Sequence, residues 1–158
     1  MSRQNLYRFM ICAAVLFFLI GELSLSRGSD DSYQGPPKDL LANNLSQCDA
    51  ALEILVKSVE PEKTYQSDEG KGGYVQCLVK GVVTKTFKGS FSTGEALTYR
   101  FTSEYDRAPQ CPIEVGLKYV VFLKHDVKTG SLWLFAEAAQ FKSSSELVRM
   151  VERLMVSK

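Results

Sequence analysis

The chain has 158 residues, which is enough for one folded domain with appendages and too few for two domains of ordinary size. Hydrophobic residues make up 45% of the chain and charged residues 23%, a composition that excludes a wholly disordered, collagen-like or coiled-coil protein. The formal net charge is only +1, so the chain as a whole is neither strongly basic nor strongly acidic.

The first 26 residues have the layout of a secretory signal peptide. Arg3 and Arg8 precede an uncharged apolar run at residues 9–20, and small residues such as Ser26 follow it. The run is shorter than the roughly 20 apolar residues that a transmembrane helix needs. We therefore expect residues 1–26 to be removed on export, which would leave a secreted, extracellular protein with no stable membrane span. An uncleaved anchor and a buried helix are the alternatives.

The charge balance argues against a nucleic-acid partner. Removal of the signal peptide takes away two of the 19 basic and one of the 18 acidic side chains, which leaves 17 of each. Nucleic-acid binding depends on Lys and Arg side chains that neutralise phosphates, and no basic run stands out in the remaining sequence. We therefore expect no binding to nucleic acid.

The sequence offers no recognisable set of catalytic or metal-binding residues. His125 is the only histidine, and no two cysteines have the C-x-x-C spacing of a zinc site. No Gly-x-Ser-x-Gly motif occurs, and the carboxylates are scattered through predicted loops. We expect the protein to have no catalytic activity, no cofactor and no metal site.

Two features of the sequence agree with export. Cys12 lies in the signal peptide, and Cys48, Cys77 and Cys111 remain after cleavage. In an oxidising compartment we expect one disulfide among these three, with the third thiol outside it. Asn44 begins the triplet Asn-Leu-Ser, which predicts N-glycosylation at that residue.

Residues 27–47 are rich in turn-forming residues and contain Pro36 and Pro37. They show little hydrophobic periodicity, so we predict a flexible, extended or disordered arm with at most a short helical turn at residues 39–43.

From residue 48 onward the pattern is that of a β protein. Alternating apolar residues and the turn residues between them predict five strands with no interleaved helices, which favours a small antiparallel barrel or sandwich. The predicted strands are residues 50–56, 74–87, 96–102, 119–123 and 132–135, the last of which could extend to residue 141. Pro61 is expected to end the first strand, with a loop over residues 60–73, and Gly81 predicts a bulge or a change of face in the second.

The last segment changes to a helical period. Leu147, Val151 and Leu154 recur at i, i+4 and i+7, and Ser143–Ser145 offer hydroxyls that can cap a helix. We predict an amphipathic C-terminal helix whose apolar stripe packs on the barrel.

Three short motifs occur in a characteristic order: Cys48-Asp49-Ala50-Ala51-Leu52-Glu53-Ile54, then Phe87-Lys88-Gly89, then Cys111 followed by Glu114-Val115-Gly116-Leu117-Lys118-Tyr119-Val120-Val121-Phe122. Together they resemble the netrin-like domain, and within that family the N-terminal domain of the tissue inhibitors of metalloproteinases. The resemblance implies a mainly β fold: a five-stranded OB-fold-like Greek-key barrel over residues 48–158, with a C-terminal amphipathic α-helix.

The resemblance also implies a function. Netrin-like domains are extracellular protein-interaction modules, and a metalloproteinase inhibitor is the alternative. The inhibitors chelate the protease zinc through an N-terminal cysteine, whereas this chain has no Cys-x-Cys, and Cys48 matches a later cysteine of the family. The loop before the cysteine that matches Cys111 contacts the protease in the inhibitors. The corresponding residues here are Tyr105, Asp106, Arg107, Ala108, Pro109 and Gln110, so an extracellular protein, a metalloproteinase among the candidates, is the implied partner.

A disulfide pairing follows from the same resemblance. The family cysteines that match Cys48 and Cys111 bond to partners that this chain lacks, so these two are expected to pair with each other. Cys77, on the face of Val75 and Val79, is then a buried strand thiol. The alternative is a bond between Cys48 and Cys77.

Overall fold

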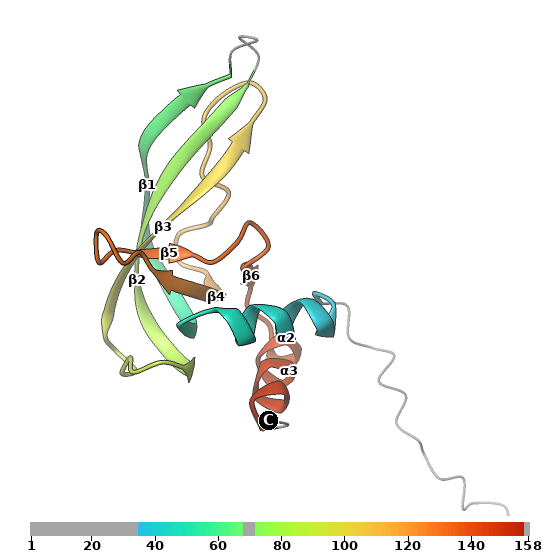
Figure 1. The fold of residues 1–158 in the computed structure, drawn as a ribbon. Coiled ribbons are helices and arrows are strands. Elements are labelled where there is room, and N and C mark those ends of the chain that lie inside the picture. Colours follow the sequence, from blue (N-terminus) through green and yellow to red (C-terminus); the bar gives the residue numbers. More distant parts are fainter. Residues whose placement is uncertain (1–34, 68–71, 157–158) are drawn as a thin grey trace, which may run out of the picture. The chain divides into compact units, whose positions relative to one another are not determined.

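The computed structural model describes residues 35–67 and 72–156; the predicted signal peptide and the first part of the predicted arm lie outside these residues. The helices and strands follow the order α2 (Lys38–Gln47), β1 (Ala50–Gln66), β2 (Gly73–Lys88), β3 (Ala96–Tyr105), β4 (Lys118–His125), β5 (Leu132–Leu134), β6 (Gln140–Lys142) and α3 (Ser145–Val156) (Figure 1).

The strands close into a barrel. The order in the sheet is β1-β2-β3-β5-β4, and β4 pairs back onto β1, while the short β6 adds to β4. The β3–β5 pairing is parallel and the others are antiparallel. This is the topology of an OB-fold-like barrel, so the predicted fold class is confirmed, including the C-terminal helix.

The alternating residues that predicted the strands line the barrel interior. The core includes Leu52, Ile54 and Val56 of β1 together with Val75 and Val79 of β2. Each of these side chains is almost fully buried. Removal of these apolar surfaces from water is the main stabilising term of the barrel. Apolar residues on one face of the strands, aliphatic on β1 and aromatic as well as aliphatic on β3, therefore account for the barrel core.

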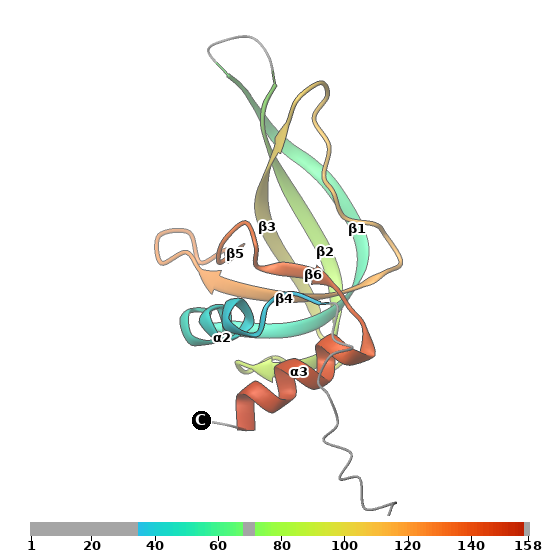
Figure 2. The same cartoon turned by 90° about the vertical axis from the view of Figure 1, so that its right-hand side faces the viewer.

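A second apolar layer lies outside the barrel, where the two helices cover it. It consists of buried residues that do not belong to the barrel core: Leu41 and Leu45 of α2, Ala51 of β1, Val120 and Phe122 of β4, Ala139, and Leu147, Met150 and Val151 of α3. Figures 1 and 2 show both helices at the same end of the barrel. The first half of β1 is consequently buried on both faces.

The prediction of a flexible arm is wrong for Lys38–Gln47, which form α2. Leu41, Asn44 and Leu45 lie at i, i+3 and i+4 and are buried, which gives the helix one packed face. At its C-terminal end, Lys88 Nζ donates to Leu45 O at 2.8 Å and also to Cys48 O. An isolated ten-residue helix is marginal in water, so contacts with the rest of the domain stabilise this one.

The prediction that β1 ends at Pro61 is also wrong, because β1 continues to Gln66 and pairs with β2 as far as Gly73. Pro61 lies at one register shift of this ladder, and a second shift lies between Val56 and Ser58, opposite Gly81. A proline is tolerated at an edge or a bulge because its missing N–H is not needed there. At Gly81 a Cβ would lie 2.9 Å from Leu55 O, so the glycine permits the close approach of the two strands.

The disulfide joins Cys77 to Cys111, so the predicted pairing of Cys48 with Cys111 is wrong, as is the alternative of Cys48 with Cys77. After β3 the chain crosses from β3 toward β1, where Gly116 N donates to Val56 O and Val56 N donates to Leu117 O. Residues 106–117, which we call the crossing segment, pass over the inner face of β2. Cys77 lies on this face and is bonded to Cys111 of the segment. Cys48 lies at the end of α2 instead, where its buried thiol donates to Leu45 O at 3.8 Å.

The pairing predicts which variant loses its sensitivity to reductant. Cys77 and Cys111 close a loop with a sequence separation of 34, which restricts the unfolded chain by roughly 3–4 kcal/mol. We expect Cys77→Ala/Cys111→Ala to lose about that much free energy of unfolding in denaturant titrations, and its stability to be unchanged by reductant.

Cys48→Ala is the matched control. It should still lose stability on reduction, because its disulfide is intact. If Cys48→Ala were insensitive to reductant, the Cys77–Cys111 pairing would be refuted.

Candidate protein-interaction surface

The outer parts of β1, β2 and β3 extend beyond the closed barrel. β4 pairs with β1 only from Ala50 to Leu55, and β5 pairs with β3 only at Tyr99 and Arg100. The remainder is a three-stranded antiparallel sheet made of residues 58–66, 73–80 and 101–105, which we call the distal sheet. It projects away from the end of the barrel that carries α2 and α3 (Figures 1 and 2).

The outward face of the distal sheet carries two exposed tyrosines. Tyr65 pairs with Tyr74 across β1 and β2, and Tyr74 pairs with Glu104 across β2 and β3, so the three side chains form one row on the same face. Tyr65 is 43% exposed and Tyr74 45%. The Lys63 ammonium lies 4.8 Å from the centroid of the Tyr65 ring. A hydrogen bond with the Glu104 carboxylate raises the pKa of Tyr74. We call Tyr65, Tyr74 and Glu104 the tyrosine row.

Beside this row, one carboxylate joins the three strands. Glu62 on β1 accepts hydrogen bonds from Arg100 Nε on β3 at 2.7 Å and from Gln76 Nε2 on β2 at 2.6 Å. A second guanidinium nitrogen of Arg100 donates to Glu62 Oε1 at 2.9 Å, so the ion pair is bidentate. These bonds, above all those from Arg100, lower the pKa of Glu62 to about 2. The Glu62 bridge holds the three strands in register beside the tyrosine row.

The 105–110 loop begins at the end of the distal sheet that carries the tyrosine row. Tyr105 ends β3 and pairs with Gly73, and its hydroxyl donates to Tyr65 O at 3.5 Å. Residues 106–110 are exposed, and Cys111 then fixes the end of the loop through its disulfide. The structure therefore places the loop that the resemblance singled out at the same end of the distal sheet as Tyr65 and Tyr74, two residues that were not predicted from the sequence.

Cys48 follows the last residue of α2 as its C-cap, and α2 lies at the opposite end of the domain from the distal sheet (Figure 1). It is 2% exposed, its N–H donates to Asn44 O at 2.9 Å, and its carbonyl oxygen accepts from Lys88 Nζ. The backbone groups that chelate zinc in the metalloproteinase inhibitors are thus bonded within the chain at Cys48.

Asn44 is buried at the helix end of the domain. Only 1% of its surface is exposed, and its Nδ2 donates to Ala138 O at 2.7 Å. A glycan bonded to Nδ2 would replace this hydrogen bond and could not be accommodated among the packed neighbours. The fold is therefore incompatible with the predicted glycosylation at Asn44.

Glu53 is the other buried polar or charged residue among those that the structure describes. Burial favours a higher pKa, but hydrogen bonds from Ser143, Thr84 and Lys118 outweigh it, and the pKa of Glu53 is lowered. Ser143 Oγ lies 2.6 Å and Lys118 Nζ 3.2 Å from the carboxylate oxygens. The carboxylate connects β1, β2, β4 and the start of α3, and its bonds explain its position without a ligand.

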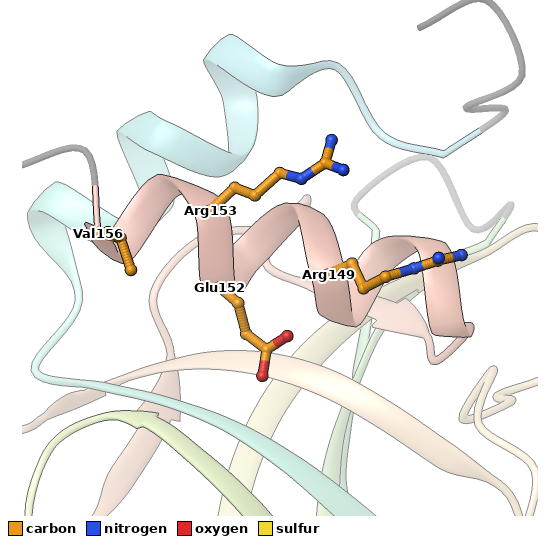
Figure 3. A pocket seen from close by; sticks show the side chains of 4 residues that line it. All are labelled: Arg149, Glu152, Arg153 and Val156. Atoms are coloured by element: carbon orange, nitrogen blue, oxygen red, sulfur yellow. The ribbon is translucent and has the colours of Figure 1, made fainter. Parts of the chain in front are cut away.

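A surface hollow on α3 is lined by Arg149, Glu152, Arg153 and Val156. Figure 3 shows that these side chains point in different directions, with Glu152 directed toward the strands and Arg153 toward α2. Glu152 forms an ion pair with Lys85 of β2, and Arg149 contacts Glu146. Because the polar groups diverge, they do not form a common binding site.

The remaining features of the described residues add no chemistry. His125 is exposed and lies near Asp49, whose carboxylate accepts the His125 backbone N–H at 2.9 Å. Among residues 35–67 and 72–156, no cluster of three or more His, Cys, Asp or Glu side chains is placed to hold a metal ion. Within the same residues, neither helix has the length and apolar character needed to cross a membrane.

Comparison of the sequence with protein-family models and with curated proteins finds no match.

The Glu62 bridge predicts a pH-dependent stability. The pKa of Glu62 is about 2 in the folded protein, below its ordinary value of 4.5, so the bridge stabilises the fold fully above pH 4.5. This contribution is lost as the pH falls from 4.5 to 2. We expect Glu62→Gln to lower the melting temperature at pH 7, and its difference from the parent to shrink progressively over that range.

Glu60→Gln is the control, since the Lys80–Glu60 pair spans 3.4 Å between two exposed side chains. It should change the melting temperature less at every pH. A Glu62→Gln difference that is the same at pH 7 and pH 2.5 would contradict the assignment.

The burial of Asn44 predicts that its side chain stabilises the domain. Asn44→Ala removes a packed side chain together with its hydrogen bond to Ala138 O, and should cost about 1–3 kcal/mol of unfolding free energy. Asn43→Ala is matched in sequence but exposed, and should change stability by less than about 0.5 kcal/mol. Equal effects of the two variants in denaturant titrations would show that Asn44 is not packed as described.

Proposed function

We propose that this protein is a secreted, netrin-like module that binds an extracellular protein through the tyrosine row and the 105–110 loop. The observation that carries the proposal is the placement of two exposed tyrosines at the same end of the distal sheet as a loop whose end is fixed by a disulfide. Tyrosine supplies a large contact area with little loss of conformational entropy, and it is enriched at protein interfaces. The outward face of strands 2 and 3 is also where OB-fold proteins commonly bind their ligands.

The charges of the distal sheet favour a protein over a polyanion. Its outward face carries Glu60, Glu62 and Glu104 as well as Lys63, Lys80 and Arg100, so the two signs balance. Arg100 is bonded to Glu62 and Lys80 to Glu60, which leaves little positive charge to neutralise phosphates. A mixed surface with exposed aromatic rings suits the polar and aromatic surface of another protein.

Metalloproteinase inhibition is the second candidate, and the exposed 105–110 loop is the feature that favours it. An inhibitor of this kind would dock through the loop without zinc chelation by Cys48, because the Cys48 backbone groups are bonded within the chain. Inhibition assays with metalloproteinases therefore belong beside the binding experiment. Inhibition that depends on the loop would favour this second function.

The test is capture of proteins from extracellular material by the immobilised full-length chain. We expect Tyr65→Ala/Tyr74→Ala to reduce the amount of the captured partner at least about tenfold, which corresponds to roughly 1.4 kcal/mol and is typical of truncated interface anchors. Val127→Ala is the control, because Val127 is exposed in the β4–β5 turn, away from the distal sheet.

The variants should melt at the same temperature as the parent, because both tyrosines are exposed. If the parent and the double tyrosine variant captured the same proteins in equal amounts, the tyrosine row would not be the binding surface.

A further inference from the structure

The outer edge of β3 is open over the distal sheet. β3 pairs with β2 along its whole length, from Ala96 to Tyr105. On its other side, the described strands pair with it only at Tyr99 and Arg100, where β5 lies. The chain then leaves β3 over the inner face of the distal sheet, toward Cys77 and Val56, and does not return along this edge. Residues 101–105 therefore present one row of backbone N–H and C=O groups outward.

The two edges of the distal sheet differ in how well they are protected against pairing. On β1, the outer residues include Pro61 and the charged Glu60 and Glu62, and two register shifts distort the strand. Proline, charge and bulges are the usual devices that prevent a strand from joining an edge. Residues 101–105 of β3 contain no proline and only one charged side chain, and their ladder with β2 has no register shift. The β3 edge is therefore the one able to accept another strand.

We propose that the strand that joins this edge is β3 of a second copy of the chain, in an antiparallel arrangement centred on Ser103. In this register Phe101 lies opposite Tyr105 of the other copy, Thr102 lies opposite Glu104, and Ser103 lies opposite Ser103. The aromatic pair forms on the inward face and the hydroxyl–carboxylate pair on the outward face, and no like charges oppose each other. The five-residue edge is thus complementary to itself, as a two-fold interface requires.

Steric limits select this register. A shift to a centre on Thr102 would extend the pairing to Tyr99 and Arg100, whose outer edge is already occupied by Leu132 and Trp133 of β5. A shift by one residue would place the outward residues of one copy opposite the inward residues of the other. A centre on Glu104 would place two Glu104 carboxylates directly opposite each other. The Ser103-centred register uses all of the open residues 101–105, keeps both faces continuous and opposes no like charges.

In this dimer the two distal sheets form one six-stranded sheet. The two-fold axis at Ser103 is perpendicular to the sheet, so both tyrosine rows lie on the same side of the assembly. The interface is small, so we expect association to be weak and dependent on protein concentration.

Cysteine cross-linking tests the register in a full-length chain that carries Cys12→Ser, so that Cys12 cannot form the cross-link. Cα atoms of directly opposite antiparallel residues lie about 4.5–5.5 Å apart, which a disulfide can span. Two Thr102 residues would be separated by two strand positions and lie roughly 8 Å apart, beyond the reach of a disulfide. Under mild oxidation, Ser103→Cys should give at least about tenfold more disulfide-linked dimer on non-reducing gels than Thr102→Cys.

Sedimentation of the unmodified chain should show a mass that rises toward that of a dimer with concentration. The Cys12→Ser chain without an added cysteine should form no covalent dimer under the same oxidation, because Cys77 and Cys111 are bonded and Cys48 is buried. Monomer at every concentration together with no Ser103→Cys cross-link would overturn the proposal. Cross-linking of Thr102→Cys as efficient as that of Ser103→Cys would overturn the register. Neither result would bear on binding of a different protein by the tyrosine row.

Discussion

The Cys77–Cys111 bond is the constraint on which the distal half of the molecule depends. β1, β2 and β3 extend past the barrel, where β4 and β5 no longer support them, and a free three-stranded extension has only one packed face to stabilise it. The crossing segment supplies the cover for that face, since Ile113 is buried in the barrel core and Cys111 is bonded to β2. The covalent bond fixes the path of this segment. That path determines where the 105–110 loop lies, and it leaves the outer edge of β3 uncovered at residues 101–105.

The other end of the domain is held by polar contacts at the margins of an apolar layer. Lys88 extends from the end of β2 to the last carbonyls of α2, where a positive charge is favourable for the helix dipole. Glu53 accepts hydrogen bonds from Thr84 of β2, from Lys118 of β4 and from Ser143, two residues before α3. Both groups fix the position of a helix relative to the barrel, whereas the apolar layer alone would allow it to slide.

The parts of the fold that could be predicted from the sequence are those with a strong one-sided pattern. Leu52, Ile54 and Val56 alternate on β1, and Leu147 and Val151 recur at a helical period on α3, so the barrel and the C-terminal helix were evident. α2 was not, because ten residues next to two prolines have little intrinsic preference and are stabilised by contacts with distant parts of the chain.

The candidate interaction surface could be predicted from the sequence only in part, for similar reasons. The 105–110 loop was singled out by resemblance and is a surface loop. Its position at the same end of the sheet as Tyr65 and Tyr74 depends on the β1–β2 register, and β1 is exposed on both faces over residues 60–66. The disulfide was mispredicted because its formation depends on the path of the crossing segment, which no local pattern specifies. The positions of Tyr65 and Tyr74 on either side of the polar, Gly-rich segment between them were the one signal in the sequence that pointed to the tyrosine row.

The parallel contact between β3 and β5 has a consequence for the dynamics of the barrel. It consists of two residue positions, Tyr99 with Leu132 and Arg100 with Trp133, whereas β1 and β2 are paired over almost their full length. A closed barrel opens most readily where the fewest backbone hydrogen bonds must break. Transient opening of this protein should therefore begin at the β3–β5 seam, and amide protons of β5 should exchange with solvent before those at the centre of β2.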